Sequence, residues 1–81
     1  MNVQIQFFSY FKELTGCDRL DRTVPPATTL GQLHEQLCAE FPALQQMRRS
    51  TLLAVDVDYQ QASYALKDGD QVSFFPPVQG G

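Results

Sequence analysis

The end of the chain carries the residues best suited to chemistry. The sequence closes with Pro76-Pro77-Val78-Gln79-Gly80-Gly81. Two prolines cannot donate strand hydrogen bonds and keep the chain extended, and the two glycines have no side chains. We therefore expect residues 76–81 to form a thin, flexible tail that presents the Gly81 carboxylate to a narrow channel in another protein. The alternative is an ordinary frayed terminus.

Few other residues have types and spacing that indicate chemistry. His34 and Cys38 lie four positions apart on a predicted helix, as two ligands of one metal ion would. The sequence has no second pair at ligand spacing, so we expect a histidine on the helix flank, a buried thiol and no metal site. Cys17 is the other cysteine, and both thiols are expected to be free.

Length and charge limit the classes of function that the chain can have. With 81 residues the chain suffices for one small domain with a thin core, which more often carries a group than builds a catalytic cavity. Its net charge is −3 and its basic residues do not cluster beyond Arg48-Arg49, so we expect no nucleic-acid partner. It has neither an apolar stretch of membrane length nor the features of a signal peptide, so we expect a cytoplasmic protein that does not bind membranes.

Two strands and a short helix are predicted near the start. A period-2 pattern marks the first strand, with Val3, Ile5 and Phe7 as its apolar members. Residues 9–15 are expected to form one or two helical turns, with Ser9 as N-cap and Gly16 as the stop. Residues 18–24 read as a second strand.

The main helix has the clearest pattern. Thr29 is its predicted N-cap, Gln32 completes a capping box, and Pro42 ends it. Its apolar stripe consists of Leu30, Leu33, Leu37 and Phe41.

The rest of the chain is predicted to be mostly strands. A short turn over residues 43–49 precedes a third strand over 52–57, with one apolar face made of Leu53, Val55 and Val57. Residues 58–66 are expected to hold a short edge strand, and residues 71–75 the last strand. The order β, β, α, β, short β, β predicts an α+β fold of the β-grasp (ubiquitin-like) type. In it, one main helix packs across a mixed sheet of four to five strands, and residues 1–81 form a single domain.

Three aromatic residues are expected on the sheet face away from the helix. Phe8 and Phe75 have the polar parity of the first and last strands, which are neighbours at the centre of a β-grasp sheet. Tyr59 follows the third strand and would extend the patch. A contiguous exposed apolar patch usually marks an interface, so we predict that these residues bind a partner.

Two segments resemble the molybdopterin synthase small-subunit family of ubiquitin-like sulfur carriers. They are DGDQVSFFPPVQGG at the end and FFSYFKELTG near the start. Where that family often has Arg-Glu in its first helix, this chain has Lys12-Glu13, which keeps the positive charge without the planar fork of arginine. The resemblance places Lys12 among the partner-binding residues.

The resemblance implies a mechanism centred on Gly81. An activating enzyme would use ATP to convert its carboxylate to a transient acyl adenylate, and a cysteine desulfurase system would supply sulfur for a thiocarboxylate. In the synthase large subunit, the thiocarboxylate would donate sulfur to cyclic pyranopterin monophosphate and form the dithiolene of molybdopterin. The tail that carries Gly81 into the partner would consist of Val78, Gln79 and Gly80. The subunit itself would bind no cofactor. A thiazole-type sulfur carrier and a ubiquitin-like protein modifier are the alternatives.

Overall fold

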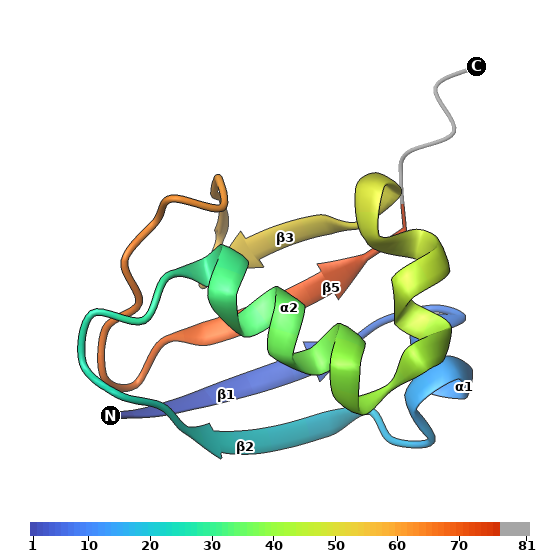
Figure 1. Ribbon diagram of the computed structural model, residues 1–81, viewed down its shortest axis with the longest axis horizontal. Coiled ribbons are helices and arrows are strands. Elements are labelled where there is room, and N and C mark those ends of the chain that lie inside the picture. Colours follow the sequence, from blue (N-terminus) through green and yellow to red (C-terminus); the bar gives the residue numbers. More distant parts are fainter. Residues whose placement is uncertain (77–81) are drawn as a thin grey trace.

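The computed structural model describes residues 1–76, so the predicted tail residues Val78, Gln79, Gly80 and Gly81 lie outside the described residues. The elements are β1 (Asn2–Phe7), α1 (Phe11–Thr15), β2 (Arg19–Thr23), α2 (Leu30–Glu40), the 3-10 helix η1 (Pro42–Ser50), β3 (Leu52–Val55), β4 (Asp58–Tyr59) and β5 (Gln71–Phe75) (Figure 1). None of the helices among these residues is long and apolar enough to cross a membrane.

Within residues 1–76, five strands form one mixed sheet in the order β2-β1-β5-β3-β4. The two central strands, β1 and β5, run parallel, whereas β2, β3 and β4 pair antiparallel with their neighbours. Helix α2 lies across one face of the sheet (Figure 1). The predicted β-grasp fold is confirmed.

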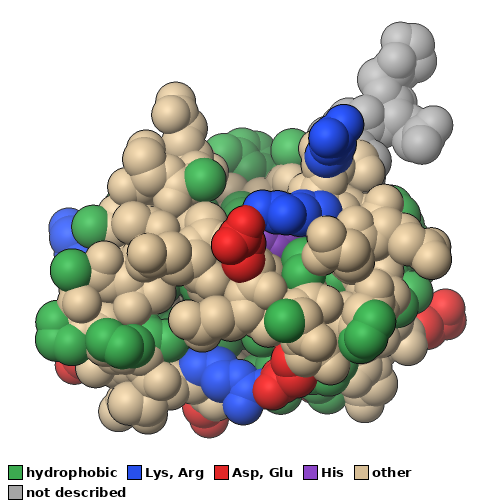
Figure 2. Space-filling view, viewed as in Figure 1, with side chains coloured by type: hydrophobic (Ala, Val, Ile, Leu, Met, Phe, Trp, Pro, Cys, Tyr) green, Lys and Arg blue, Asp and Glu red, His purple; other side chains and the backbone are tan. Residues whose placement is uncertain are grey.

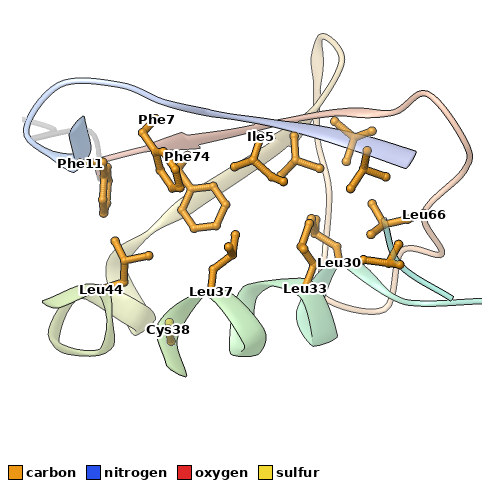
Figure 3. Close-up of a cluster of buried hydrophobic side chains, with 14 residues drawn as sticks. Ile5, Phe7, Phe11, Leu30, Leu33, Leu37, Cys38, Leu44, Leu66 and Phe74 are labelled. Atoms are coloured by element: carbon orange, nitrogen blue, oxygen red, sulfur yellow. The ribbon is translucent and has the colours of Figure 1, made fainter. Parts of the chain in front are cut away.

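The core lies between α2 and the sheet. Inward residues of β1 and β5 meet the leucines of α2, as Figure 3 shows for Ile5, Phe7, Phe74, Leu33 and Leu37. The rings of Phe7 and Phe74 pack edge to face, with centroids 5.2 Å apart. Strand alternation therefore directs the apolar set of each central strand toward the helix.

The first turn of α2 has its backbone donors satisfied from two sources. The predicted capping box is present: Thr29 Oγ1 accepts from the Gln32 N–H at 3.2 Å, and the Thr29 N–H donates to Gln32 Oε1 at 2.9 Å. The N–H of Gly31 also donates to the Ala62 carbonyl at 2.9 Å. The helix is thereby fixed to the loop that follows β4.

Gly31 permits this close approach. A β-carbon added there would lie 2.8 Å from the β-carbon of Ala62 and 3.2 Å from its carbonyl oxygen. The helix and the loop can therefore stay hydrogen-bonded only if position 31 carries no side chain or the loop moves.

Two predictions about element ends are wrong. Ser9 does not cap α1, because it has a left-handed φ of 58° and the helix begins at Phe11 without a side-chain cap. The third strand ends at Val55, because Asp56 has a φ of 56° and turns the chain. Val57 therefore does not join the core face and is 93% exposed.

His34 is the least satisfied polar group of the core. Its ring packs edge-on against Phe74 with centroids 5.4 Å apart, and Nε2 is buried without a hydrogen-bond partner among residues 1–76. Burial lowers the pKa of His34, the charge of Arg48 lowers it further, and Glu35 opposes the change. The folded protein therefore favours the neutral form of His34.

We expect Gly31→Ala to lower the free energy of unfolding by about 1–2 kcal/mol, because the added methyl group overpacks against Ala62. Adding Ala62→Gly removes the clashing β-carbon and should recover most of the loss. Urea denaturation of both single variants and the double variant measures this coupling. If the changes in free energy of unfolding of the two single variants simply added in the double variant, the contact would not restrict position 31.

We expect the free energy of unfolding to fall as the pH drops below about 6.5, because the unfolded chain binds a proton on His34 that the folded protein rejects. The stabilisation is complete above the unfolded pKa and is lost as the pH falls toward the lower folded value. In His34→Phe this part of the pH dependence should be absent. Urea denaturation between pH 8 and pH 5 measures the free energy of unfolding of both proteins. If it changed equally with pH in the parent chain and in His34→Phe, the prediction would be wrong.

Candidate functional site

The centre of the site is a stacked pair of phenylalanines on neighbouring strands. Parallel pairing of β1 with β5 sets Phe7 opposite Phe74, both buried. The next residue of each strand has the opposite parity, so Phe8 and Phe75 emerge together on the face away from α2. Their rings stack with centroids 4.7 Å apart and an interplanar angle of 9°. The predicted contact between the two strands is confirmed.

Two residues from the other side of β5 extend the pair. Tyr59 in β4 places its ring edge-on to Phe75, with centroids 6.3 Å apart, as the sequence predicted. Leu52 is the cross-strand partner of Phe75 in β3. We call Phe8, Leu52, Tyr59 and Phe75 the aromatic face.

The aromatic face exposes apolar surface that the fold does not use. Tyr59 is 65% exposed, and the other three members are half-buried. Stacking covers one side of each phenylalanine ring, and each residue remains partly exposed. Contiguous surface of this kind in a small chain indicates a docking site.

Sequence reasoning missed Leu52. Its signal was the strand alternation itself: Leu53 and Val55 point toward the core, so Leu52 must point the other way. The continuous apolar run of β3 concealed this alternation.

Lys12 lies beside the aromatic face and outside its stacked core. It is exposed on α1 and lines, with Phe8, Asp18 and Arg19, a shallow hollow of about 110 Å³. The arrangement provides positive charge at the edge of the face.

Phe75 is the last residue of β5 and Pro76 the last described residue. The predicted tail residues Val78, Gln79, Gly80 and Gly81 come later in the sequence and lie outside the described residues.

The structure offers no described metal centre. Within residues 1–76, no three His, Cys, Asp or Glu side chains gather closely enough to hold an ion. His34 and Cys38 are both buried, and burial raises the pKa of the Cys38 thiol.

Known proteins match the chain over almost its whole length. The sequence model of the ThiS family matches residues 5–81. The molybdopterin synthase sulfur carrier subunit of Aedes aegypti is 33% identical over 89 residues, which cover 100% of this chain and 90% of the relative.

Solved structures agree with these sequence matches. The putative molybdopterin converting factor, subunit 1, of Pyrococcus furiosus superposes with a TM-score of 0.88 at 26% identity, covering 96% of this chain and 99% of that one. In the complex of subunits 1 and 2 of the molybdopterin-converting factor from Helicobacter pylori, a chain at 24% identity has the same fold, with a TM-score of 0.71 and full coverage of both chains. The chain therefore belongs to the ThiS family, among the molybdopterin synthase sulfur carrier subunits.

Proposed function

We propose that this chain carries sulfur on the C-terminal carboxylate of Gly81 and delivers it to cyclic pyranopterin monophosphate to form the molybdopterin dithiolene. The observation that supports the proposal best is the aromatic face on β5, the strand that leads directly into the tail. A partner that holds this face lies next to the point where the tail begins.

The chemistry at Gly81 proceeds by activation and substitution. A carboxylate is a poor electrophile, so an adenylating enzyme first transfers AMP to it from ATP and releases pyrophosphate. The terminal sulfur of a persulfide, supplied through a cysteine desulfurase, then displaces AMP and forms an acyl disulfide. A second thiol cleaves the sulfur–sulfur bond and leaves the thiocarboxylate. The sulfur of this soft nucleophile attacks the pterin precursor in the synthase large subunit and forms a thioester. Hydrolysis of the thioester leaves the sulfur on the pterin and returns the Gly81 carboxylate, so two charged carriers supply the two sulfurs of the dithiolene.

Glycine at the last two positions gives the partner enzymes access. A β-carbon beside the reacting carbonyl of Gly81 would crowd both the adenylating site and the sulfur-accepting geometry, where small misplacements cost rate steeply. A glycine at position 80 allows backbone conformations that other residues resist. All groups that act on Gly81 belong to the partners, so this chain supplies the reactant.

The aromatic face is the common docking surface for the large subunit and the adenylating enzyme. A large-subunit partner is supported by the Helicobacter pylori relative, which is found in a complex of subunits 1 and 2. Both partners act on the same carboxylate, and the tail leaves from one strand. The two complexes therefore exclude one another.

A ubiquitin-like protein modifier would require the same adenylation, because an isopeptide bond also starts from an activated carboxylate. A thiazole-type carrier would carry the same thiocarboxylate to another acceptor. The acceptor of the sulfur, or of the acyl group, distinguishes these alternatives.

Deletion of Gly81 should leave the free energy of unfolding unchanged and abolish pterin thiolation, because the core lies within the described residues. Intact-mass spectrometry of the complete chain from its own cells should show a species in which sulfur replaces one oxygen, and the truncated chain should lack it. Thiolation by the truncated chain would refute a carrier role for Gly81.

Phe75→Asp should weaken binding to both the large subunit and the adenylating enzyme about thirtyfold or more. Truncating an aromatic anchor costs about 2 kcal/mol, and a charge buried without a partner costs more. Isothermal titration calorimetry with each partner measures the loss.

Val57→Asp is the matched control, because Val57 is an exposed apolar residue that does not belong to the aromatic face. It should bind like the parent chain. If Phe75→Asp bound each partner as tightly as the parent chain does, the face would not be a docking surface.

A further inference from the structure

A groove runs along the outer edge of the sheet, between η1 and the segment after β4. It consists of two adjoining hollows of about 270 and 440 Å³ that share His34, Arg48 and Ala62. The first hollow is also lined by Thr51, Leu52, Leu53, Tyr59 and Gln60, and the second by Gly31 and Arg49. We call these ten residues the edge groove.

The edge groove is basic on a chain that is acidic. The net charge is −3, yet among the described residues that line the groove there are two arginines and no Asp or Glu. Figure 2 shows the single histidine, in purple, beneath a basic side chain on the face that carries α2. An anionic group is the natural complement of such a surface.

Arg48 keeps binding capacity although it forms an ion pair. Its Nη2 donates to Glu35 Oε1, and both side chains are largely exposed, at 43% and 61%. An exposed pair of this kind contributes little free energy. A guanidinium has five N–H donors, so most of them remain for a second carboxylate.

The edge groove is continuous with the aromatic face. Leu52 and Tyr59 belong to both, and Tyr59 lies in β4, the edge strand of the sheet. A polypeptide that covers the aromatic face can therefore pass over β4 and enter the groove. Leu53 and Arg48 both line that groove.

From this geometry we infer that the edge groove binds an acidic segment of the synthase large subunit, the same partner that covers the aromatic face. An apolar side chain of that segment packs on Leu53, and a carboxylate binds Arg48 and Arg49. The inference rests on the proposed function for the choice of partner, and it adds a charged contact outside the aromatic face.

The test is isothermal titration calorimetry of the full chain with the large subunit from the same organism. Arg48→Glu/Arg49→Glu should weaken binding about tenfold at low salt, and the difference should shrink as salt is raised. The matched control is Arg22→Glu/Lys67→Glu, which changes the net charge equally outside the face and the groove, at one half-buried and one exposed position. Like Arg48, Arg22 is paired with a glutamate, Glu40. The control should stay within about twofold of the parent chain.

A second variant should change the affinity in the opposite direction. Glu35→Gln removes the carboxylate that competes for Arg48, so it should tighten binding about two- to threefold. Thermal unfolding of each variant confirms that it is folded. Equal weakening by both double variants would indicate general charge steering and overturn the inference, as would a weakening confined to the adenylating enzyme.

The two proposals fail in different ways. If Phe75→Asp abolishes binding to the large subunit while Arg48→Glu/Arg49→Glu binds like the parent chain, the edge groove is not part of the interface and the docking role of the aromatic face stands. If Phe75→Asp binds normally, the docking role of the face is wrong, and with it the inference for the groove.

Discussion

The parallel pairing of β1 with β5 at the centre of the sheet is the constraint on which the rest of the structure depends. It sets Phe7 beside Phe74 against the helix and brings Phe8 and Phe75 into contact on the opposite face. The core and the docking surface are therefore consequences of one register. Because side chains alternate along a strand, a shift of one residue would exchange the two sets and expose the core pair.

This arrangement separates stability from recognition within a very small domain. Residues that face α2 supply the buried apolar surface, whereas the aromatic face leaves surface exposed that would stabilise the fold if it were covered. A partner bound to the aromatic face, as we propose, would recover that free energy. The stacked rings are already aligned by two paired strands, so little conformational entropy is lost when the partner docks.

The fold alone does not define the chemistry. Ubiquitin-like domains carry different functions on one architecture, and the function we propose rests on the C-terminal residues and on the aromatic face. The aromatic face provides apolar anchoring, and the basic residues beside it, Lys12 at one side and Arg48 at the other, provide orientation. This combination is consistent with the proposal that more than one enzyme binds and releases the carrier.

The sequence by itself determined the features that local rules control. Alternation in β1 and β5 gave the inward and outward residues, Thr29 and Gln32 gave the start of α2, and the end of the chain carried the family resemblance. The sequence also predicted correctly that Phe8, Phe75 and Tyr59 share one face, because the fold class shows which strands are neighbours and parity shows which side chains point the same way.

Only the tertiary structure decided features that depend on contacts between distant segments. The turn at Asp56 removed Val57 from the core face, because a left-handed residue ends a strand whatever its apolar pattern. Leu52 joined the aromatic face through its pairing with Phe75, and Gly31 lies too close to Ala62 for a β-carbon to fit without a shift. The edge groove arises where η1 approaches the loop after β4, and no local pattern encodes how close two such segments come.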